Sequence, residues 1–355
     1  MEWLRRTRLQ ILLQRMFMIN RLLYCRHKLF SCISACWHTK LNPLLLLLLP
    51  LSFLFGLVVF VRRKLFQLGV CETTKLPVPV VVVGNINVGG TGKTQLVIFL
   101  ANLLHAQGYR VGIVMRGYKA KYKTDYLLVA DSDPVDLIGD EAKMLQQRTK
   151  AHIALARKRS VAVAALVDRS LVDIVISDDG LQHYAMHRDL EIAVVDAAIL
   201  FGNNFLLPAG PLREPRSRIE LVDFVIYKGC SQHKYEFKVK LVGVFSLATK
   251  DKLDSSVRDV VAVAGIGNPD NFYKLLQQHH FNVLNFSKYA DHEHYTADHF
   301  QIALEYGVPI LITEKDAVKC GHLPKYIAEK IFYVKVDTVV SDVFVEDFLC
   351  KLKEF

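Results

Sequence analysis

Residues 80–107 read VVVVGNINVGGTGKTQLVIFLANLLHAQ, and this stretch decides the fold. Its four leading valines are β-branched, and such a run is typical of a strand buried on both faces in a parallel sheet. A loop with three glycines follows, and an apolar helix is predicted from Lys93 to about Gln107, where Gly108 ends it. A glycine-rich loop between a strand and a helix directs backbone N–H groups at bound phosphate. The stretch therefore predicts a site for a nucleoside triphosphate.

The loop follows the P-loop pattern G-x-x-x-x-G-K-[ST] with one departure. The pattern places a glycine at position 87, where this chain has Asn87, a residue type that tolerates positive φ better than most. Lys93 is expected to reach the terminal phosphates, and the Thr94 hydroxyl is expected to hold Mg²⁺. The predicted nucleotide-binding residues are Asn87, Val88, Gly89, Gly90, Thr91, Gly92, Lys93 and Thr94.

The chain of 355 residues has a formal net charge of +10, and this charge is concentrated near the N-terminus. Residues 1–40 carry +7 and residues 62–64 carry +3, so the remaining residues sum to zero. A basic protein invites a nucleic-acid interpretation, but here the globular body is neutral and the basic segments flank an apolar one. That pattern favours anionic lipid head groups and argues against nucleic acid as a partner.

Leu44–Val61 is an uncharged run of 18 residues, just long enough to cross a bilayer core. Pro50 is expected to break this helix near its first third. Both flanks are positive and the ATP site downstream must be cytoplasmic, so we expect a kinked interfacial or re-entrant anchor rather than a single span. A buried core helix is the remaining alternative. Residues 1–38 could form an amphipathic interfacial helix or an upstream extension outside the working protein, and the sequence leaves both open.

From Val78 onward, predicted strands and helices alternate, which indicates a parallel sheet covered by helices. Strands are expected at 80–84, 111–115, 152–156, 172–177, 191–195 and 222–227 and, after a β-ribbon at 235–247, at 259–264, 282–286, 308–313 and 331–336. Helices are expected near 93–107, 139–148, 158–169, 270–279, 297–306 and 342–353.

The predicted fold class is therefore α/β, with a P-loop NTPase-type parallel sheet domain, a second smaller α/β domain and an N-terminal membrane-associated helix. The expected organisation is a basic N-terminal extension (1–40), a membrane anchor helix (41–66), a P-loop domain (67–232) and a C-terminal α/β domain (233–355).

Paired carboxylates, Asp178 and Asp179, end the apolar strand VDIVIS. In a P-loop protein, an acidic residue at the carboxyl edge of a buried strand is the Mg²⁺ partner of the P-loop threonine, although aspartate also caps turns at strand ends. Arg116 follows the second predicted strand, so it lies on the same sheet edge as the P-loop, where ligands of open α/β sheets bind.

Two further polar positions allow more than one interpretation. Asp140 opens a predicted helix and is either its N-terminal acid or a catalytic carboxylate at the mouth of the site. His292, in the run DHEH (291–294), could belong to a zinc site, but no H-E-x-x-H motif supports one, and the seven cysteines include no C-x-x-C pair. A histidine beside an aspartate could also form an acid/base pair. The cysteine pattern is typical of a reduced, cytoplasmic protein.

Residues 207–218, LPAGPLREPRSR, form a rigid Pro/Gly loop with three arginines. Arginine forks bind phosphate well, and a solvated basic loop is the alternative. Lys315, in TEKD (313–316), resembles the guanine-reading [NT]-K-x-D pattern only faintly, because the lysine is one place late, and we discount it.

These motifs together resemble the tetraacyldisaccharide 4′-kinase family, which phosphorylates the 4′-hydroxyl of the lipid A disaccharide 1-phosphate precursor. The resemblance covers residues 42–355 in order. The matching stretches are LLLLLPLSFLFGLV (45–58), PVPVVVVGNINVGGTGKT (77–94), RGY (116–118), GDE (139–141), SDDGLQH (177–183), LPAGPLREP (207–215), AGIGNP (264–269), DHEHYT (291–296) and TEKDAVK (313–319). Ala142 stands where the family usually has proline, and residues 1–40 have no counterpart in the family.

The resemblance implies an ATP-dependent kinase that gives lipid IVA. It implies ATP and Mg²⁺ held by Lys93, Thr94, Asp178 and Asp179, an Asp140–His292 pair that activates the sugar hydroxyl, and Arg116 in the active-site region. We assign Arg213, Arg216 and Asp291 to the substrate. The implied partners are the lipid A disaccharide precursor and anionic inner-membrane lipids, with no obligate protein partner. The implied location is the inner membrane, with the catalytic domains on its cytoplasmic face.

Other functional classes make different demands on the same residues. A membrane-tethered P-loop ATPase acting as a switch would carry a second lysine before the paired glycines, where this chain has Val88. A GTPase switch is disfavoured by the misplaced Lys315. A nucleotide-sensing membrane scaffold would need neither Asp140 nor His292.

Overall fold

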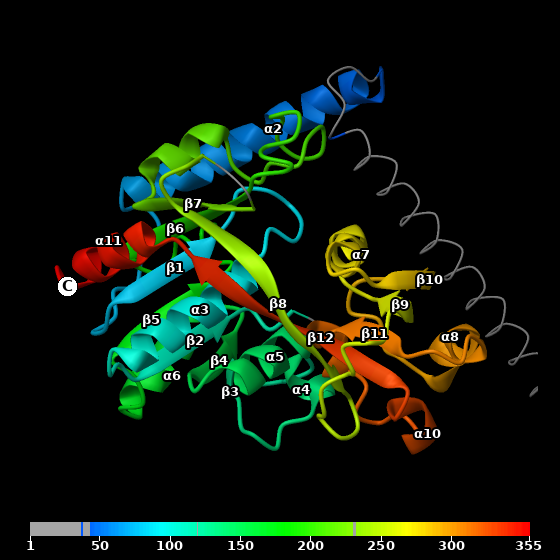
Figure 1. Cartoon of the computed structure of the whole chain (residues 1–355). Helices are drawn as coiled ribbons and strands as arrows, with labels where there is room; N and C mark the ends of the chain where they lie inside the picture. The colour runs from blue at the N-terminus through cyan, green and yellow to red at the C-terminus, as the bar shows by residue number, and fades with distance from the viewer. Residues whose placement is uncertain (1–36, 38–42, 119, 230–231) are drawn as a thin grey trace, which may run out of the picture. The chain divides into compact units, whose positions relative to one another are not determined.

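The computed structural model describes residues 37, 43–118, 120–229 and 232–355 (Figure 1). The chain forms two compact units. The first contains Met1–Lys64, Ile86–Val88 and Ile199–Arg218, and the second contains Leu65–Asn85, Gly89–Ala198 and Ile219–Phe355. Apart from Trp37, the predicted basic extension over residues 1–40 lies outside the described residues. The predicted domain boundaries, 67–232 and 233–355, stay a prediction.

The second unit is built on one sheet of 12 strands in the order β10-β9-β11-β12-β8-β7-β6-β1-β5-β2-β4-β3. The strands are β1 Val80–Gly84, β2 Val111–Met115, β3 Tyr126–Leu128, β4 His152–Ala156, β5 Ile174–Asp178, β6 Leu190–Asp196, β7 Phe224–Lys228, β8 Glu236–Ser246, β9 Asp259–Ala264, β10 Asn282–Lys288, β11 Ile310–Thr313 and β12 Ile331–Val340. The helices and 3₁₀ turns that accompany them are α3 Lys93–Ala106, α4 Val135–Ile138, α5 Asp140–Arg148, α6 Arg159–Asp168, η1 Arg216–Leu221, α7 Pro269–Gln278, η2 Ala297–Phe300, α8 Gln301–Glu305, α9 Glu314–Ala317, α10 Lys325–Ala328 and α11 Asp342–Leu352. The predicted α/β class is confirmed.

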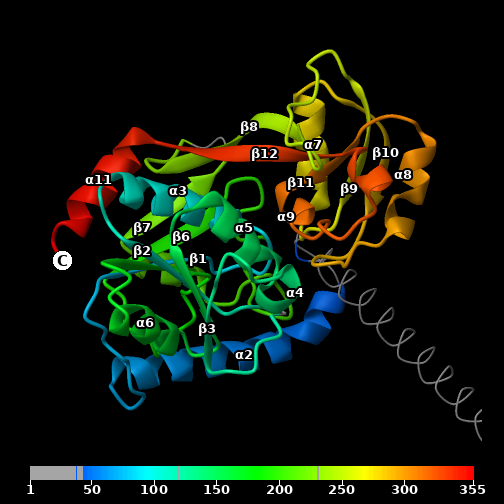
Figure 2. The same cartoon turned by 90° about the horizontal axis from the view of Figure 1, so that it is seen from below.

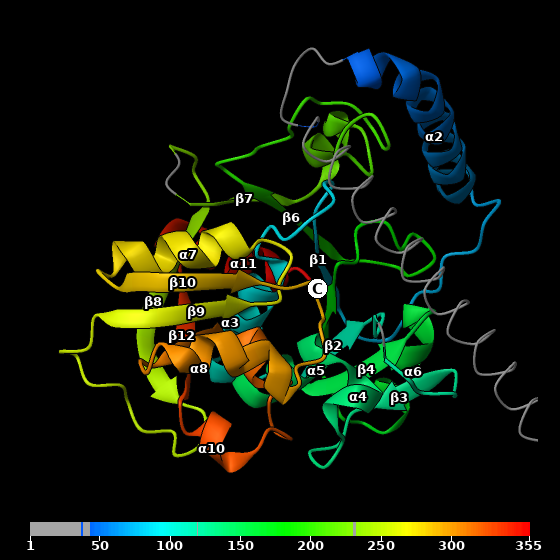
Figure 3. The ribbon, with the colours of Figure 1, turned by 90° about the vertical axis from the view of Figure 1, so that its right-hand side faces the viewer.

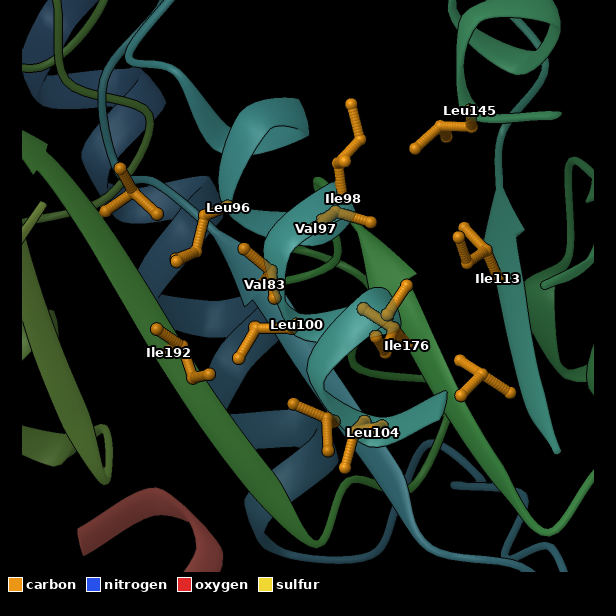
Figure 4. Packing of buried hydrophobic residues seen from close by; sticks show 14 of the residues in the cluster. Val83, Leu96, Val97, Ile98, Leu100, Leu104, Ile113, Leu145, Ile176 and Ile192 are labelled. Atoms are coloured by element: carbon orange, nitrogen blue, oxygen red, sulfur yellow. The ribbon is translucent and has the colours of Figure 1, made fainter. Parts of the chain in front are cut away.

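Strand β1 lies inside the sheet, with β5 on one side and β6 on the other, both parallel to it. All five of its residues are buried, as the valine run predicts. Alternate β1 side chains point to opposite faces, so Val81 and Val83 pack into the cluster that α3 covers. Figure 4 shows Leu96 and Leu100 of α3 facing the strands, and burial of each such leucine contributes about 1.5–3 kcal/mol.

Two long strands, β8 and β12, connect the first part of the sheet, made of β1 to β7, with the second part, made of β9, β10 and β11 (Figure 2). β8 is parallel to β7 but antiparallel to β12, so strand direction reverses between β8 and β12, as it also does at the edge strand β3, which is antiparallel to β4. The register of the β8–β12 pair shifts between Lys335 and Val336, which marks a bulge or similar irregularity. The sequence predicts a ribbon near 235–247 but not this pairing.

The strands beyond the ribbon have helices on both faces. Along β9, Val260, Ala262 and Ala264 pack in the cluster that contains Phe272 of α7, whereas Val261 and Val263 pack in the cluster that contains Ala303 of α8. This period of two explains why residues 260–264 are all apolar and buried, although the strand begins with the exposed Asp259. Figure 3 shows α7 and α8 on opposite sides of the strands. The last helix, α11, returns to the first part of the sheet, where Phe344 and Phe348 pack on Phe224 in the same cluster as α3.

The long apolar helix α2 spans Pro43–Gln67. Among the described residues, Leu45–Gln67 is the one helix long and apolar enough to cross a membrane, with a mean hydropathy of 2.5 and 11% of its most apolar window buried. The prediction that Pro50 breaks the helix is wrong, because the helix continues through Pro50. A proline removes one helical hydrogen bond, and the rest hold the helix together.

Within the first unit, the predicted Pro/Gly loop lies against this helix and against the P-loop segment. Ser52 donates to the Leu206 carbonyl at 2.7 Å. Val88 N–H donates to the Pro211 carbonyl at 2.8 Å, and Arg213 N–H donates to the Ile86 carbonyl at 2.6 Å. The loop is tight at Gly210, where a Cβ atom would lie 2.2 Å from the Phe205 carbonyl oxygen, so only glycine fits there.

Candidate active site

The P-loop residues of the second unit surround the Lys93 ammonium. Gly92 adopts a left-handed conformation, with φ of 87°, just before α3 begins. Lys93 Nζ donates to Asn85 Oδ1 at 3.1 Å and forms an ion pair with Asp179 Oδ1 at 3.3 Å. Asn85 in turn donates from Nδ2 to Thr91 Oγ1 at 3.1 Å. The loop, the start of α3 and the end of β5 therefore meet at one lysine.

Asp178 is the last residue of β5 and is buried beside Thr94. The Thr94 hydroxyl donates to Asp178 Oδ2 at 3.4 Å. Burial raises the pKa of Asp178 to about 7, and the negative charge of Glu141 adds to this effect, whereas Lys93 opposes it. Asp179 follows with φ of 51°, an unusual conformation for a residue with a side chain.

A buried arginine that the sequence analysis does not name, Arg159, lies at the start of α6. Its Nη1 donates to the Asp179 carbonyl at 2.9 Å. Burial lowers the pKa of Arg159, while the charges of Asp179 and Asp178 act in the opposite direction and that of Arg116 lowers it further. Arg116 is exposed at the end of β2. The two arginines thus add positive charge around the carboxyl ends of the central strands.

Asp140 and His292 form a close pair although they are far apart in the chain. His292 Nδ1 lies 2.8 Å from both carboxylate oxygens of Asp140, and both side chains are largely buried. Burial raises the pKa of Asp140, but the hydrogen bond from His292 and the charge of Lys315 outweigh it, so the net shift is downward. An ionised Asp140 accepts the Nδ1 proton, which directs Nε2 away from the pair. His292 has φ of 62°, so its backbone is also strained.

Lys315, which the sequence analysis discounts, is the cation beside this pair. Its Nζ lies 3.0 Å from Glu141 Oε1, 3.3 Å from Asp291 Oδ1 and 4.0 Å from Asp140 Oδ2. Asp291 Oδ2 also lies 3.5 Å from His292 Nε2. These negative neighbours outweigh burial and raise the pKa of Lys315. A cluster of three carboxylates thus shares one permanently charged ammonium.

The predicted phosphate-binding arginines lie in the first unit. Arg213 is half-buried and follows Leu212, whose backbone forms a bridge with Asn87. Arg216 is exposed, and its guanidinium lies 5.1 Å from the centre of the Phe201 ring. Asn87, at the position where the P-loop pattern has glycine, donates from Nδ2 to the Leu200 carbonyl at 2.6 Å. This bond gives a physical reason for a side chain at position 87.

A sequence profile of the family described as tetraacyldisaccharide-1-P 4′-kinase matches residues 44–353. The chain belongs to this family. The tetraacyldisaccharide 4′-kinases of Shewanella sp. (strain W3-18-1) and Legionella pneumophila (strain Lens) are 42% and 41% identical to it, over 91% and 85% of this chain and 95% and 92% of those proteins. The crystal structure of LpxK from Aquifex aeolicus in complex with ATP is 28% identical, with a TM-score of 0.72 over 88% of this chain and 98% of that chain.

Membership of the tetraacyldisaccharide-1-P 4′-kinase family makes the chain a kinase. The zinc interpretation of the histidine run finds no support, because no group of three or more His, Cys, Asp or Glu side chains among the described residues could hold a metal ion. His299 instead caps the turn at Thr296, with Nδ1 2.9 Å from the threonine hydroxyl. His294 is exposed beside Asp136.

Three site residues of this family member are absent from the sequence-based prediction, and each had a signal. Asn85 follows the valine strand directly, Glu141 follows Asp140, and Arg159 begins the helix after β4. Asn85 stands at the carboxyl end of a parallel strand and Arg159 at the start of the helix after one, which is where ligands of α/β sheets bind, whereas Glu141 lies in the first turn of α5, which follows α4. The basic run ARKRS (156–160) does not reveal which of its cations is buried.

Proposed function

We propose that the chain transfers the γ-phosphoryl group of ATP to the 4′-hydroxyl of a tetraacyldisaccharide 1-phosphate precursor of lipid A, giving lipid IVA. The observation that carries the proposal is the link between two groups of residues. α5, which begins with Asp140, packs against α3, which begins with Lys93 and Thr94. The charge of Glu141, next to Asp140, also raises the pKa of Asp178. A nucleotide site and a candidate base therefore lie within one charge network.

In this proposal, Lys93 and the N–H groups of the loop bind and neutralise the terminal phosphates of ATP, and Arg116 adds positive charge at the same sheet edge. Asp140, whose pKa is lowered, stays ionised at neutral pH and accepts the proton of the sugar hydroxyl. His292 orients the Asp140 carboxylate through its Nδ1–H and offers Nε2 as a second proton site. Phosphoryl transfer needs alignment and charge neutralisation more than covalent help.

The donor set beside the P-loop fits Mg²⁺. Asp178 is fully buried, and its Oδ1 is without a hydrogen-bond partner in the described part of the chain. A buried carboxylate oxygen of this kind is a ready ligand for a hard cation, which binds through few protein oxygens plus phosphate and water. Thr94, Asp178 and Asp179 would hold the ion. When bound, Mg²⁺ neutralises charge on the β- and γ-phosphates.

We further propose that α2 anchors the enzyme to the inner membrane, with the catalytic residues on the cytoplasmic side. Most of its large apolar side chains are exposed, including Leu47 and Phe53. Arg62–Lys64 follow the apolar stretch and would bind anionic lipid head groups. An acylated substrate stays in the membrane, so an anchor would hold the site at head-group height. The proposed organisation remains an anchor helix, a P-loop NTPase-type kinase domain (67–232) and a C-terminal α/β domain (233–355).

The test is transfer of ³²P from γ-labelled ATP to tetraacyldisaccharide 1-phosphate in detergent micelles with Mg²⁺. We expect the wild-type enzyme to label the lipid, and we expect Lys93→Ala and Asp140→Asn each to slow labelling by about 100-fold or more. The matched control is Arg110→Met, because Arg110 forms an exposed ion pair with Asp173 at the start of β2. ATP hydrolysis without lipid labelling would overturn the proposal in favour of a membrane-tethered ATPase.

A further inference from the structure

Helix α9 lies beside α5, and its first two residues reach opposite ends of that helix. Glu314 forms an ion pair with Arg148, the last residue of α5. Lys315 forms an ion pair with Glu141 in the first turn of α5. The acidic start of α5 therefore meets the lysine of α9, and the basic end of α5 meets the glutamate of α9.

We propose that Glu314 and Lys315 form a two-ended clamp that positions α5, and with it the Asp140 carboxylate, against His292. The clamp consists of the Glu314–Arg148 pair at one end and the Lys315–Glu141 pair at the other. The inference rests on the proposed function, in which Asp140 accepts the proton of the sugar hydroxyl. In this view Glu314 and Arg148 are positioning residues that act through α5.

The base of the clamp is held firmly at the end of β11. The Thr313 hydroxyl donates to Asp316 Oδ2 at 2.7 Å, and its oxygen accepts the Asp316 N–H at 3.1 Å. Asp316 is fully buried and also accepts the Gly265 N–H at 3.2 Å. Lys319 Nζ lies 2.7 Å from Asp316 Oδ1 and compensates its charge. These contacts among four residues fix the backbone of α9, from which the Glu314 and Lys315 side chains extend.

The Arg148 end of the clamp reaches the irregular point of the β8–β12 pair. Both terminal nitrogens of Arg148 lie 3.0 Å from the Val336 carbonyl oxygen, and Nη2 also binds Asp337. The strand register shifts between Lys335 and Val336, so the arginine binds where the shift occurs. The side chains of Arg148 and Glu314 are only 9% and 12% exposed, so solvent screens their attraction little.

The Lys315 end of the clamp contacts the site itself. Its ammonium is 3.0 Å from Glu141 and 4.0 Å from Asp140, and it is 3.3 Å from Asp291, next to His292. The same cation therefore touches the α5 side and the His292 side of the pair. A shift of α5 along its axis would separate Asp140 from His292. The ion pairs at both ends of α5 oppose such a shift.

Positioning explains these buried ion pairs better than stability does. A buried salt bridge adds little net stability, because desolvation of the two charges cancels most of their attraction, but it fixes geometry. Catalysis depends on that geometry, since misplacement of a reacting group by about 1 Å costs about 100-fold in rate. A purely structural pair would instead be expected to change activity only as far as it changes the folded fraction.

The test compares Arg148→Met, Glu314→Gln and the double variant with wild type and with the Arg110→Met control. Arg148→Met leaves Glu314 buried without its counter-charge, so we expect its Tm to fall. Glu314→Gln in the same chain removes that uncompensated charge, so part of the Tm returns. Turnover must then be measured on both proteins at a temperature where each is folded, with lipid and Mg²⁺-ATP saturating.

We expect Arg148→Met to lower kcat about 10- to 100-fold, with the KM for ATP changed less than about twofold. The double variant is expected to keep the low kcat although its Tm recovers, and the acid limb of its kcat–pH profile is expected to move upward as Asp140 loses its partners. A kcat that recovers together with the Tm, or an unchanged pH profile, would overturn the clamp.

The outcome also separates this inference from the proposed function. If wild type fails to label the lipid, the proposed function fails. If wild type labels the lipid and Arg148→Met matches Arg110→Met in kcat, the clamp alone fails. A second readout needs no turnover: the His292 Nδ1–H proton resonance, identified by its loss in His292→Gln. Clamp variants should weaken or shift it, and an unchanged resonance would contradict positioning.

Discussion

The P-loop corner and the Asp140–Lys315 cluster, the two halves of the proposed active site, are assembled in different ways. At the P-loop, Asn85 is hydrogen-bonded to both Thr91 and Lys93, and the three residues lie within eight positions of the chain. At the cluster, His292 pairs with Asp140 across 152 positions, and Lys315 pairs with Glu141 across 174. The first geometry follows from local sequence, whereas the second exists only when the whole sheet has formed. In the proposed function, ATP binding depends on the local half and activation of the acceptor on the long-range half, so we expect mutations to separate the two.

The largest effect is expected at the local half of the site. Lys93→Ala should lower kcat/KM by about 10³-fold or more, because the ammonium that neutralises the terminal phosphates is removed. Lipid labelling and ATP binding, measured by isothermal titration calorimetry, should both fall, while Arg110→Met matches wild type. A loss below tenfold would show that Lys93 does not bind the phosphates, and the local half of the site would then not be the ATP site.

Removal of the long-range base should separate the two halves. Asp140→Asn should lower kcat about 10²- to 10⁴-fold, and His292→Gln should lower it less, because the carboxylate remains. Binding of ATP should change by less than about threefold in either variant, since the P-loop contacts stay in place. A parallel loss of ATP binding would assign the altered residue to the nucleotide pocket instead.

The raised pKa of Asp178 predicts a pH dependence of stability that belongs to the nucleotide half. The folded pKa of about 7 exceeds the usual value of 3.8, so the folded state holds a proton that the unfolded state releases between these pH values. The contribution of Asp178 to the free energy of unfolding is therefore full below about pH 4. It is lost as pH rises through 7, at up to about 1.4 kcal/mol per pH unit. Denaturation of the nucleotide-free protein in EDTA at pH 5 and pH 8 measures it.

The control for this prediction is Asp178→Asn, which cannot ionise. The variant should lack this pH dependence. Because it buries no charge at position 178, it should be more stable than wild type at pH 8 without nucleotide. The same slope in wild type and variant would assign the pH dependence to other groups.

The smallest effect is expected at Arg216. It is exposed and packs on the Phe201 ring, so Arg216→Met should leave folding intact and should raise the KM for the lipid about two- to fivefold, because one exposed phosphate contact is weak. Arg216→Lys should retain most of the affinity. The KM for the lipid, measured at fixed micelle concentration, decides between a substrate contact and a solvated arginine, for which the KM stays at the wild-type value.

Most of the fold could be predicted because its elements are long and strongly patterned. The valine run, the α3 helix and the repeated alternation of strands and helices appear where they were expected. The short elements β3, α4, α9 and α10 were missed, since three or four residues carry no periodicity. The antiparallel step at β8 was also missed, because pairing partners depend on chain segments far from the ribbon.

The site could be predicted where a motif fixes it and not where tertiary packing does. The P-loop residues were predicted from spacing, and their role in nucleotide binding stays a prediction. Asp140 and His292 were named through a family resemblance, and the structure places them 2.8 Å apart. Lys315 was discounted because its motif was judged as a guanine reader. Its contacts come instead from the fold, which brings the end of β11 beside the start of α5.

The return of α11 to the first part of the sheet has a consequence for synthesis on the ribosome. Phe344 and Phe348 are fully buried against Phe224 in the same core as the P-loop helix, yet they are translated long after both of these elements. The part of the sheet that holds β1 to β7 therefore emerges early but lacks part of its core until α11 has also emerged. Until then the nascent chain keeps an apolar surface exposed, so deletion of α11 would impair the core beneath the P-loop helix rather than the core around β9 to β11, which α11 follows more closely in the sequence.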